Sequence, residues 1–330
     1  MAPTIFGGAM ATLRQYLRVR LMVWRDLGFA VPHRTTNQMY YRMLGAALTV
    51  AASLAAGTAG AEGLTNGGKL LLTGGVTNVE GAGGGGLATW ATITGYETVD
   101  GVGGNVHGTW LKLPDYDFQA YGAAIGFRDR VEVSYARQTF DTGSTGAKLG
   151  IGSGFTFHQE IIGAKVRLFG DAIYDQDSWK PQVAAGVQFK RNDRGAIIKA
   201  VGGKDDNGVD YYVAATKVLL NQSLVLDGTL RATKANQAGI LGFGGNGHDD
   251  YSLQFEGSAG YLVTKRLLVG VEYRSKPDNL AGLKEDDWMD VFAAYAINKN
   301  LSVTAAYADL GDVVTFKDQR GLYVSLQAGF

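Results

Sequence analysis

Cysteine is absent from this 330-residue sequence. Disulfide bonds, thiolate nucleophiles and cysteine metal sites are therefore excluded. Long apolar runs are also missing from the chain after the amino-terminal region. No stretch there reaches the roughly 18 uncharged residues that a membrane-spanning helix needs. Most of the chain therefore cannot be a helical membrane protein.

Glycine and tyrosine are abundant instead. The chain has 48 glycines and 16 tyrosines, 46% of its residues are hydrophobic, and its mean hydropathy is -0.03. Such composition, with only weak hydrophobicity in each segment, is typical of membrane β-barrels.

An export signal is predicted near the amino terminus. Arg42 precedes the apolar stretch 43–58, which ends at Ala59-Gly60-Ala61, the small-x-small pattern of a signal-peptidase site. We expect cleavage after Ala61, with Ala59 and Ala61 as the recognised small residues. A short membrane anchor is the alternative.

Residues 1–38 stand in front of this signal and fit no export pattern. A start site at Met39 or Met43 explains them more simply than a short amphipathic helix does. Residues 1–61 hold six of the 31 basic residues and one of the 31 acidic residues, so the exported chain is mildly acidic. Nucleic-acid binding needs a basic surface, and we predict no nucleic-acid partner.

Apolar and polar residues alternate from residue 105 onward, the period of a strand with one apolar face. Twelve strands are predicted, at 105–113, 117–127, 131–140, 161–168, 182–190, 209–216, 224–231, 251–261, 267–274, 291–297, 301–307 and 322–330. Two weaker segments, 69–78 and 87–96, raise the count to 14. We therefore predict an all-β fold, a closed antiparallel transmembrane barrel of 14 strands, with 12 strands and an N-terminal plug as the alternative.

Connection lengths predict the topology. The turns 128–130, 221–222, 264–265 and 298–300 are short and alternate with the long loops 141–158, 191–208, 236–249, 276–286 and 311–318. Short turns on the periplasmic side and long loops outside are the outer-membrane pattern. Two features strain this scheme: segment 169–180 is long for a periplasmic turn, and 196–201 resembles a further strand.

Three regions follow from these patterns. Residues 1–61 are an extension and signal peptide, 62–104 a glycine-rich segment of first strands or plug, and 105–330 the barrel. The run GAGGGG at 81–86 formally matches a dinucleotide-binding glycine motif, but no amphipathic helix follows it. A flexible or plug-forming loop is the better interpretation.

Charged residues at inner-face positions should line the barrel lumen. A closed barrel alone leaves no unpaired strand edge in hydrocarbon, and a lipid-facing charge costs roughly 2–4 kcal/mol at the bilayer midplane. The candidates are Glu132, Lys165, Arg167, Asp227, Arg231, Glu256, Glu272 and Arg274. A soluble β-sandwich also explains alternation, but it accounts less well for the export signal and the turn asymmetry.

The final strand carries a pattern that bacterial barrel-assembly machinery reads. A polar residue, a glycine two positions later, alternating apolar residues and a terminal aromatic are present as Gln319, Gly321, Val324, Leu326 and Phe330. An ordinary edge strand is the alternative.

Several stretches together resemble an uncharacterised family of Gram-negative outer-membrane proteins, a domain of unknown function. They are LLLTGGVTNVEGAGGGG, GAAIGFRDRVEVSYARQTFDTG, ATKANQAGILGFGG, EYRSKPDNL and FKDQRGLYVSLQAGF. The resemblance covers 69–330 and implies an outer-membrane barrel. It implies no substrate and no catalytic residue.

Catalytic signals are weak. His158, or His248 beside Asp249 and Asp250, could serve an outer-membrane hydrolase, but no nucleophile motif accompanies either. The acidic runs at 248–250 and 285–287 could bind a divalent cation, although exposed acidic loops are usually only solvated. We predict no enzyme activity, no metal and no cofactor.

Two function classes remain open from the sequence. The first is a passive channel or transporter for a small solute; the second is a non-conducting structural or surface-interaction barrel. An outer-membrane hydrolase is the weaker alternative. The expected partners are outer-membrane lipid, lipopolysaccharide and the barrel-assembly machinery.

Overall fold

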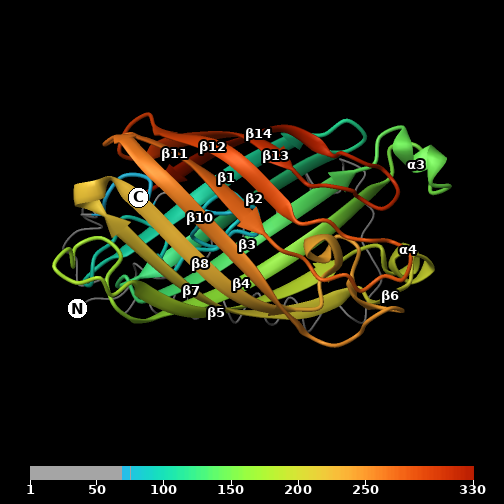
Figure 1. Cartoon of the computed structure of the whole chain (residues 1–330), viewed down its shortest axis with the longest axis horizontal. Helices are drawn as coiled ribbons and strands as arrows, with labels where there is room; N and C mark the ends of the chain where they lie inside the picture. The colour runs from blue at the N-terminus through green and yellow to red at the C-terminus, as the bar shows by residue number, and fades with distance from the viewer. Residues whose placement is uncertain (1–68, 75) are drawn as a thin grey trace, which may run out of the picture. The chain divides into compact units, whose positions relative to one another are not determined.

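The computed structural model describes residues 69–74 and 76–330, which form a closed antiparallel β-barrel of twelve strands (Figure 1). Neighbouring strands pair in the order β1, β14, β13, β12, β11, β10, β8, β7, β5, β4, β3 and β2, so the first strand closes against the last. At this closure Trp110 pairs with Val324 and Gly108 with Leu326. The predictions for residues 1–61, including cleavage at Ala59 and Ala61, lie outside the described residues.

The elements follow one another with few interruptions. The barrel strands are β1 (Val102–Lys112), β2 (Asp117–Phe127), β3 (Val131–Asp141), β4 (Thr156–Phe169), β5 (Gln182–Asn192), β7 (Asn207–Leu219), β8 (Leu224–Thr233), β10 (Ser252–Thr264), β11 (Leu267–Arg274), β12 (Trp288–Ala296), β13 (Leu301–Asp309) and β14 (Arg320–Gly329). The connections contain α3 (Thr145–Lys148), α4 (Gly195–Ala200), η1 (Leu220–Gln222), η2 (Asn236–Gly239) and a two-stranded sheet of β6 (Gly203–Asp205) and β9 (Phe243–Gly245).

The prediction of 14 barrel strands is wrong, and the twelve-strand alternative matches the structure. Segments 69–78 and 87–96 form no barrel strand; they make isolated bridges, such as Thr77 with Gly83. Their backbone amides bond instead to side chains that point into the barrel, so these segments need no neighbouring strand.

Short and long connections lie at opposite ends of the barrel, except for the short connection 113–116 between β1 and β2, which lies at the end that carries the long loops. The turns 128–130, 220–223, 265–266 and 297–300 lie at one end, here named the short-turn end, together with 170–181. The loops 142–155, 193–206, 234–251, 275–287 and 310–319 lie at the other, the long-loop end. The strand-like stretch 196–201 is mostly the helix α4, so the strand count stays even. No helix in the described part of the chain is long and apolar enough to cross a membrane.

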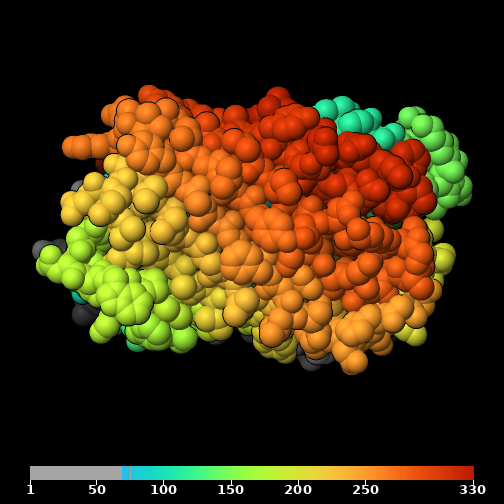
Figure 2. Space-filling model, in the orientation of Figure 1, coloured from blue at the N-terminus to red at the C-terminus, as the bar shows by residue number. Residues whose placement is uncertain are grey.

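The two faces of the barrel wall differ sharply. Along β14, Leu322 and Leu326 are exposed, whereas Tyr323, Ser325 and Gln327, which alternate with the outward residues, are buried in the lumen. The same alternation leaves large apolar side chains outward on other strands, among them Trp110, Phe189, Leu230, Leu253, Val271 and Val291. Figure 2 shows the wall of β8 and β10 to β13 as a continuous surface. The outer face is therefore mainly apolar and the inner face mainly polar.

Candidate functional site: a plugged barrel lumen

The barrel interior is occupied by the segment that precedes β1, blue in Figure 1. We name residues 69–97, described except for 75, the plug. Its residues from 76 to 97 are buried except Gly85 and Gly86, which are partly buried. Its backbone bonds to strands on different sides of the barrel: Thr77 N to Gln327 Oε1 (2.8 Å), Ala91 N to Thr216 Oγ1 (2.7 Å) and Thr229 Oγ1 to Thr89 O (2.6 Å).

Three lumen carboxylates hold backbone amides of the plug. Gly83 N donates to Glu132 Oε1 (3.0 Å), Leu87 N to Glu272 Oε2 (2.7 Å) and Thr89 N to Glu256 Oε2 (2.9 Å). Hydrogen bonds from backbone amides to ionised carboxylates are stronger than neutral ones. The glycine-rich segment is therefore fixed by the wall around it and needs no secondary structure of its own.

Lys165 on β4 donates hydrogen bonds to backbone carbonyls of the plug. Its Nζ donates to Gly83 O (3.1 Å), Trp90 O (3.1 Å) and Thr92 O (2.7 Å), and it pairs with Glu132 Oε2 at 3.1 Å. The side chain is fully buried, so its charge depends on these partners. One lysine thus joins three backbone carbonyls of the plug to the wall.

A buried ion cluster lies beside the plug. We define it as the carboxylates of Glu80, Asp210 and Glu256 with the cations of Lys190, Arg231 and Arg274. The closest contacts are Lys190 Nζ to Glu80 Oε1 (2.5 Å) and to Asp210 Oδ2 (2.7 Å), Arg231 Nε to Glu256 Oε1 (2.5 Å), and Arg274 Nη2 to Glu80 Oε1 (2.8 Å). Three negative groups face three positive groups, so the ion cluster is balanced in charge.

Glycine lets the plug backbone approach the carboxylates closely. A Cβ atom on Gly85 would lie 1.6 Å from Glu272 Oε1, and one on Gly83 would lie 2.9 Å from Glu132 Oε2. The run at 81–86 therefore allows backbone and carboxylate to approach closely, a role that has nothing to do with phosphate binding.

Two of the predicted lumen residues lie apart from these contacts. Arg167, near the short-turn end, pairs with Asp129 and with Asp171 (3.1 Å). Asp227 is partly buried and accepts a hydrogen bond from Thr216 Oγ1 at 2.5 Å. The other six, Glu132, Lys165, Arg231, Glu256, Glu272 and Arg274, are buried in the lumen.

The residues of the expected assembly signal lie on β14 and directly beside it. Val324 and Leu326 face outward, and Gly321 lies against Lys112 O. Before the strand, Gln319 is buried and its Nε2 donates to Asp115 Oδ2 (2.9 Å); after it, the Phe330 carbonyl accepts from Gly104 N (3.0 Å). Their role in assembly stays a prediction.

The histidines beyond residue 61 are separated. His107 faces Thr77 Oγ1 (2.9 Å) inside the barrel, His158 contacts Asp193 (3.0 Å) and His248 contacts Asn279 (3.3 Å). Within residues 69–74 and 76–330, no group of three or more His, Asp or Glu side chains could hold a metal ion.

Buried charges also occur outside the strands. Burial raises the pKa of Glu97, near the short-turn end, to about 7, although Lys69 Nζ lies 3.3 Å away. In the loop 275–287, burial raises the pKa of Glu285 and lowers that of its partner Lys276. Gln237 of η2 joins both, accepting from Lys276 Nζ (2.7 Å) and donating its backbone N–H to Glu285 (2.7 Å).

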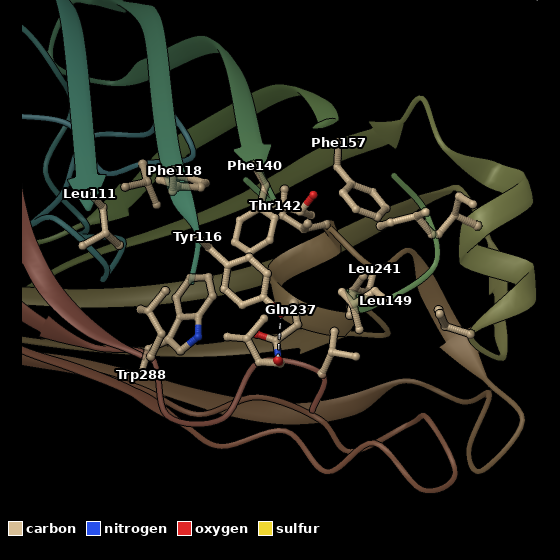
Figure 3. Close-up of a pocket in the computed structure, with 18 of the residues that line it drawn as sticks. Leu111, Tyr116, Phe118, Phe140, Thr142, Leu149, Phe157, Gln237, Leu241 and Trp288 are labelled. Carbon is tan, nitrogen blue, oxygen red and sulfur yellow. Dashed lines mark hydrogen bonds between the residues drawn. The ribbon is translucent and has the colours of Figure 1, made fainter. Parts of the chain in front are cut away.

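A cavity of about 110 Å³ lies between the plug and the loops of the long-loop end. Figure 3 shows Tyr116, Phe140, Phe157 and Leu241 converging on it. Plug residues Val79 and Leu87 form part of its wall. The lumen is therefore filled at the plug and hollow beside it.

These observations define the class: a twelve-stranded antiparallel β-barrel with a mainly apolar outer face and a plug in its lumen. The family model described as "Protein of unknown function (DUF3034)" matches residues 73–327, and the chain belongs to this family. The resemblance seen in the sequence is thereby confirmed.

No curated protein matches the sequence. Solved structures similar to it include the KdgM porin (11% identity, 68% of this chain and 99% of that chain, TM-score 0.44) and the NanC porin (10%, 69% and 98%, 0.43). Another is the COG4313 outer membrane channel from Pseudomonas putida F1 (12%, 69% and 95%, 0.42). Similarities this distant carry no information on what this chain binds.

Sequence reasoning missed half of the ion cluster. Lys190 and Asp210 occupy inner positions of alternating strands, so strand parity was a signal that could have found them. Glu80 lies in a segment without periodicity, and nothing in its neighbourhood marks it as the partner of two strand arginines.

Proposed function

We propose that the protein is an outer-membrane barrel that forms a channel for a small solute, closed in this structure by the plug. The band of outward apolar side chains supports a membrane position, because soluble monomers rarely expose contiguous apolar patches above a few hundred Å². Long loops then face outside and short turns face the periplasm. Outer-membrane lipid, lipopolysaccharide and the assembly machinery are the partners that this position implies.

The observation that favours a channel is how the plug is attached. It pairs with no barrel strand and is held mainly by hydrogen bonds and ion pairs to lumen side chains, with one backbone hydrogen bond from Tyr96 N to Phe330 O (2.9 Å) after the end of β14. The plug can therefore leave the lumen while all twelve strands stay paired. A barrel that serves only as a scaffold could fill its lumen with wall side chains and would need no such segment.

The test uses the absence of cysteine from the chain. Thr77 Oγ1 in the plug lies 3.1 Å from Asn105 Oδ1 on β1, so Thr77→Cys with Asn105→Cys places two thiols side by side. We expect solute flux or single-channel openings from residues 62–330 in planar bilayers when the pair is reduced, and their loss when it is oxidised. Each single cysteine variant is the control and should not respond to oxidation.

Lys165→Met is the second arm, because it removes three plug contacts at once. It should open more often than the wild type. If neither the wild type, the reduced pair nor Lys165→Met conducts while all are folded, the channel is rejected.

That negative result would favour the second candidate, a non-conducting structural barrel. The balanced ion cluster supports it, since a filled interior needs its charges paired. A hydrolase has less support, because the histidines lie apart.

A further inference from the structure

We propose that the cavity beside the plug is a binding site for a small apolar organic molecule, about the size of one aromatic ring. The idea that such a molecule is also the transported solute rests on the proposed channel. Binding of the molecule in the cavity does not depend on the channel, because the cavity is present in the closed barrel.

Apolar side chains from separate parts of the fold make the wall. Leu111, Phe118 and Phe140 come from the ends of β1, β2 and β3, Phe157 from the start of β4, and Leu241 from the loop after η2 (Figure 3). These side chains are buried, and each is fixed by its own element. The cavity is therefore enclosed by strand ends and loops together and is not a gap between two adjacent side chains.

Three polar groups along the wall are already engaged. Thr142 Oγ1 donates to Phe155 O (2.8 Å), Tyr116 Oη donates to Val313 O (3.3 Å), and Gln237 Oε1 accepts from Lys276 Nζ (2.7 Å). A buried water needs two to four polar partners, roughly, to be stable. These three groups thus offer little to water or a sugar, and the mainly apolar lining favours an apolar occupant.

Trp288 and Tyr323 add two polar atoms. Both residues line the cavity and are buried, and Trp288 Nε1 and Tyr323 Oη have no hydrogen-bond partner among the residues that the structure describes. A buried N–H without an acceptor is destabilising. An apolar ligand with a single acceptor oxygen, such as a phenol or a small ketone, would supply that acceptor.

The volume sets the size of the ligand. An apolar cavity of about 150 Å³ in another protein stays dry and binds benzene. At about 110 Å³ this cavity matches a single ring or a short alkyl chain. Fused ring systems and sugars are too large without movement of the loops.

Backbone strain at the wall indicates that the cavity is maintained. Gln237 and Val314 both line it with positive φ, 46° and 60°, and Ala238 beside them has φ 56°. A β-branched residue in this region is rare and unfavourable. Strained backbone persists where surrounding contacts enforce it, and it concentrates at ligand sites.

The experiment measures contact between a brominated probe and Trp288. Trp110 and Trp179 are exposed, so Trp110→Phe with Trp179→Phe gives a background in which only buried tryptophans remain in residues 62–330. The refolded protein in lipid nanodiscs is titrated with bromobenzene, whose heavy atom quenches an indole that it touches. We expect saturable quenching that benzene competes away and glycerol does not.

Two filling variants locate the site. Leu241→Phe and, on the exposed loop, Leu149→Phe each add volume to the cavity wall and should weaken saturable quenching by about ten-fold or more. Leu253→Phe, on the outward face, is the matched control and should bind like the background. Adding Trp288→Phe to the background should abolish the saturable component.

Quenching that does not saturate, or that persists unchanged in both folded filling variants, overturns the site. Saturable binding without conductance in any arm would retain the site and reject the channel. Conductance without saturable binding would retain the channel and reject the binding site.

Discussion

Gly85 lies against the carboxylate of Glu272, and this contact predicts the outcome of adding one methyl group. In Gly85→Ala the new Cβ would displace Glu272, whose two oxygens accept from Leu87 N and Ser258 Oγ. Leaving a buried donor without its acceptor costs about 1–3 kcal/mol. We expect a loss of that size in the free energy of unfolding, measured by urea titration in lipid vesicles.

Gly101→Ala is the matched control for this substitution. A Cβ there would meet no heavy atom closer than 3.4 Å, an ordinary contact, and its φ is not positive. Equal losses for the two variants would mean that the close approach at Gly85 does not hold the plug.

Glu97 predicts a pH dependence. Burial outweighs the attraction of Lys69 and raises its pKa to about 7, against about 4.3 in an unfolded chain. The folded protein therefore binds this proton more tightly, so the stabilisation is complete below about pH 4 and is lost as pH rises through 7.

The midpoint of thermal unfolding should accordingly fall between pH 5 and 8 in the wild type, by the equivalent of about 3 kcal/mol at most. Glu97→Gln should reduce the slope of this profile without abolishing it, because burial also raises the pKa of Glu285 to about 7. Asp117→Asn, in an exposed pair with Lys112, should leave the profile unchanged. A wild-type profile that rises with pH in this window would contradict the assignment.

Strand periodicity explains how far sequence alone could go. All twelve barrel strands alternate in a way that the sequence displays, because one face meets an apolar surrounding and the other meets polar groups. Segments 69–78 and 87–96 were wrongly predicted as barrel strands. They lie inside the lumen, so neither of their faces meets the apolar surrounding outside the barrel and their sequence need not alternate. Their partners are Glu132, Lys165 and Glu272, which lie far away in the chain.

β14 carries the test of the facing assignment. Leu326 is 45% exposed on the outer face and pairs with Gly108 and Val303. Leu326→Arg should cost about 2–4 kcal/mol if the residue is near the bilayer midplane, and it should reduce the heat-modifiable, membrane-inserted form on gels. Leu326→Val, which keeps an apolar surface, is the control; normal insertion of the arginine variant would show that the position does not face lipid.

The whole barrel combines a wall that is stable by strand pairing with an interior that is stable by polar contacts. The sequence predicts the wall well, and it predicts that lumen charges face inward, but it does not predict their pairing. Glu256 and Glu272 illustrate this limit: both point inward on adjacent strands, where Glu256 pairs with Arg274 and Glu272 with Ser258, yet only Glu256 belongs to the ion cluster. In the described part of the chain Glu272 forms no ion pair, and it bonds Leu87 N and Ser258 Oγ instead.

This difference makes the two glutamates each other's control. Glu256→Gln leaves Arg231 and Arg274 short of a negative charge in a buried site, and breaking a buried pair typically costs about 3–5 kcal/mol. Glu272→Gln retains an acceptor oxygen for Leu87 N and strands no cation, but it replaces the oxygen that accepts from Ser258 Oγ. We therefore expect it to cost about 1 kcal/mol, the net value of one hydrogen bond. Urea unfolding of both variants in lipid vesicles, with conductance recorded on the same preparations, measures the contrast.

A water-filled lumen would instead shift ion selectivity in both variants and leave their stabilities equal, because hydrated charges interact weakly. Equal stabilities would therefore reject the buried ion cluster, and with it the closed lumen.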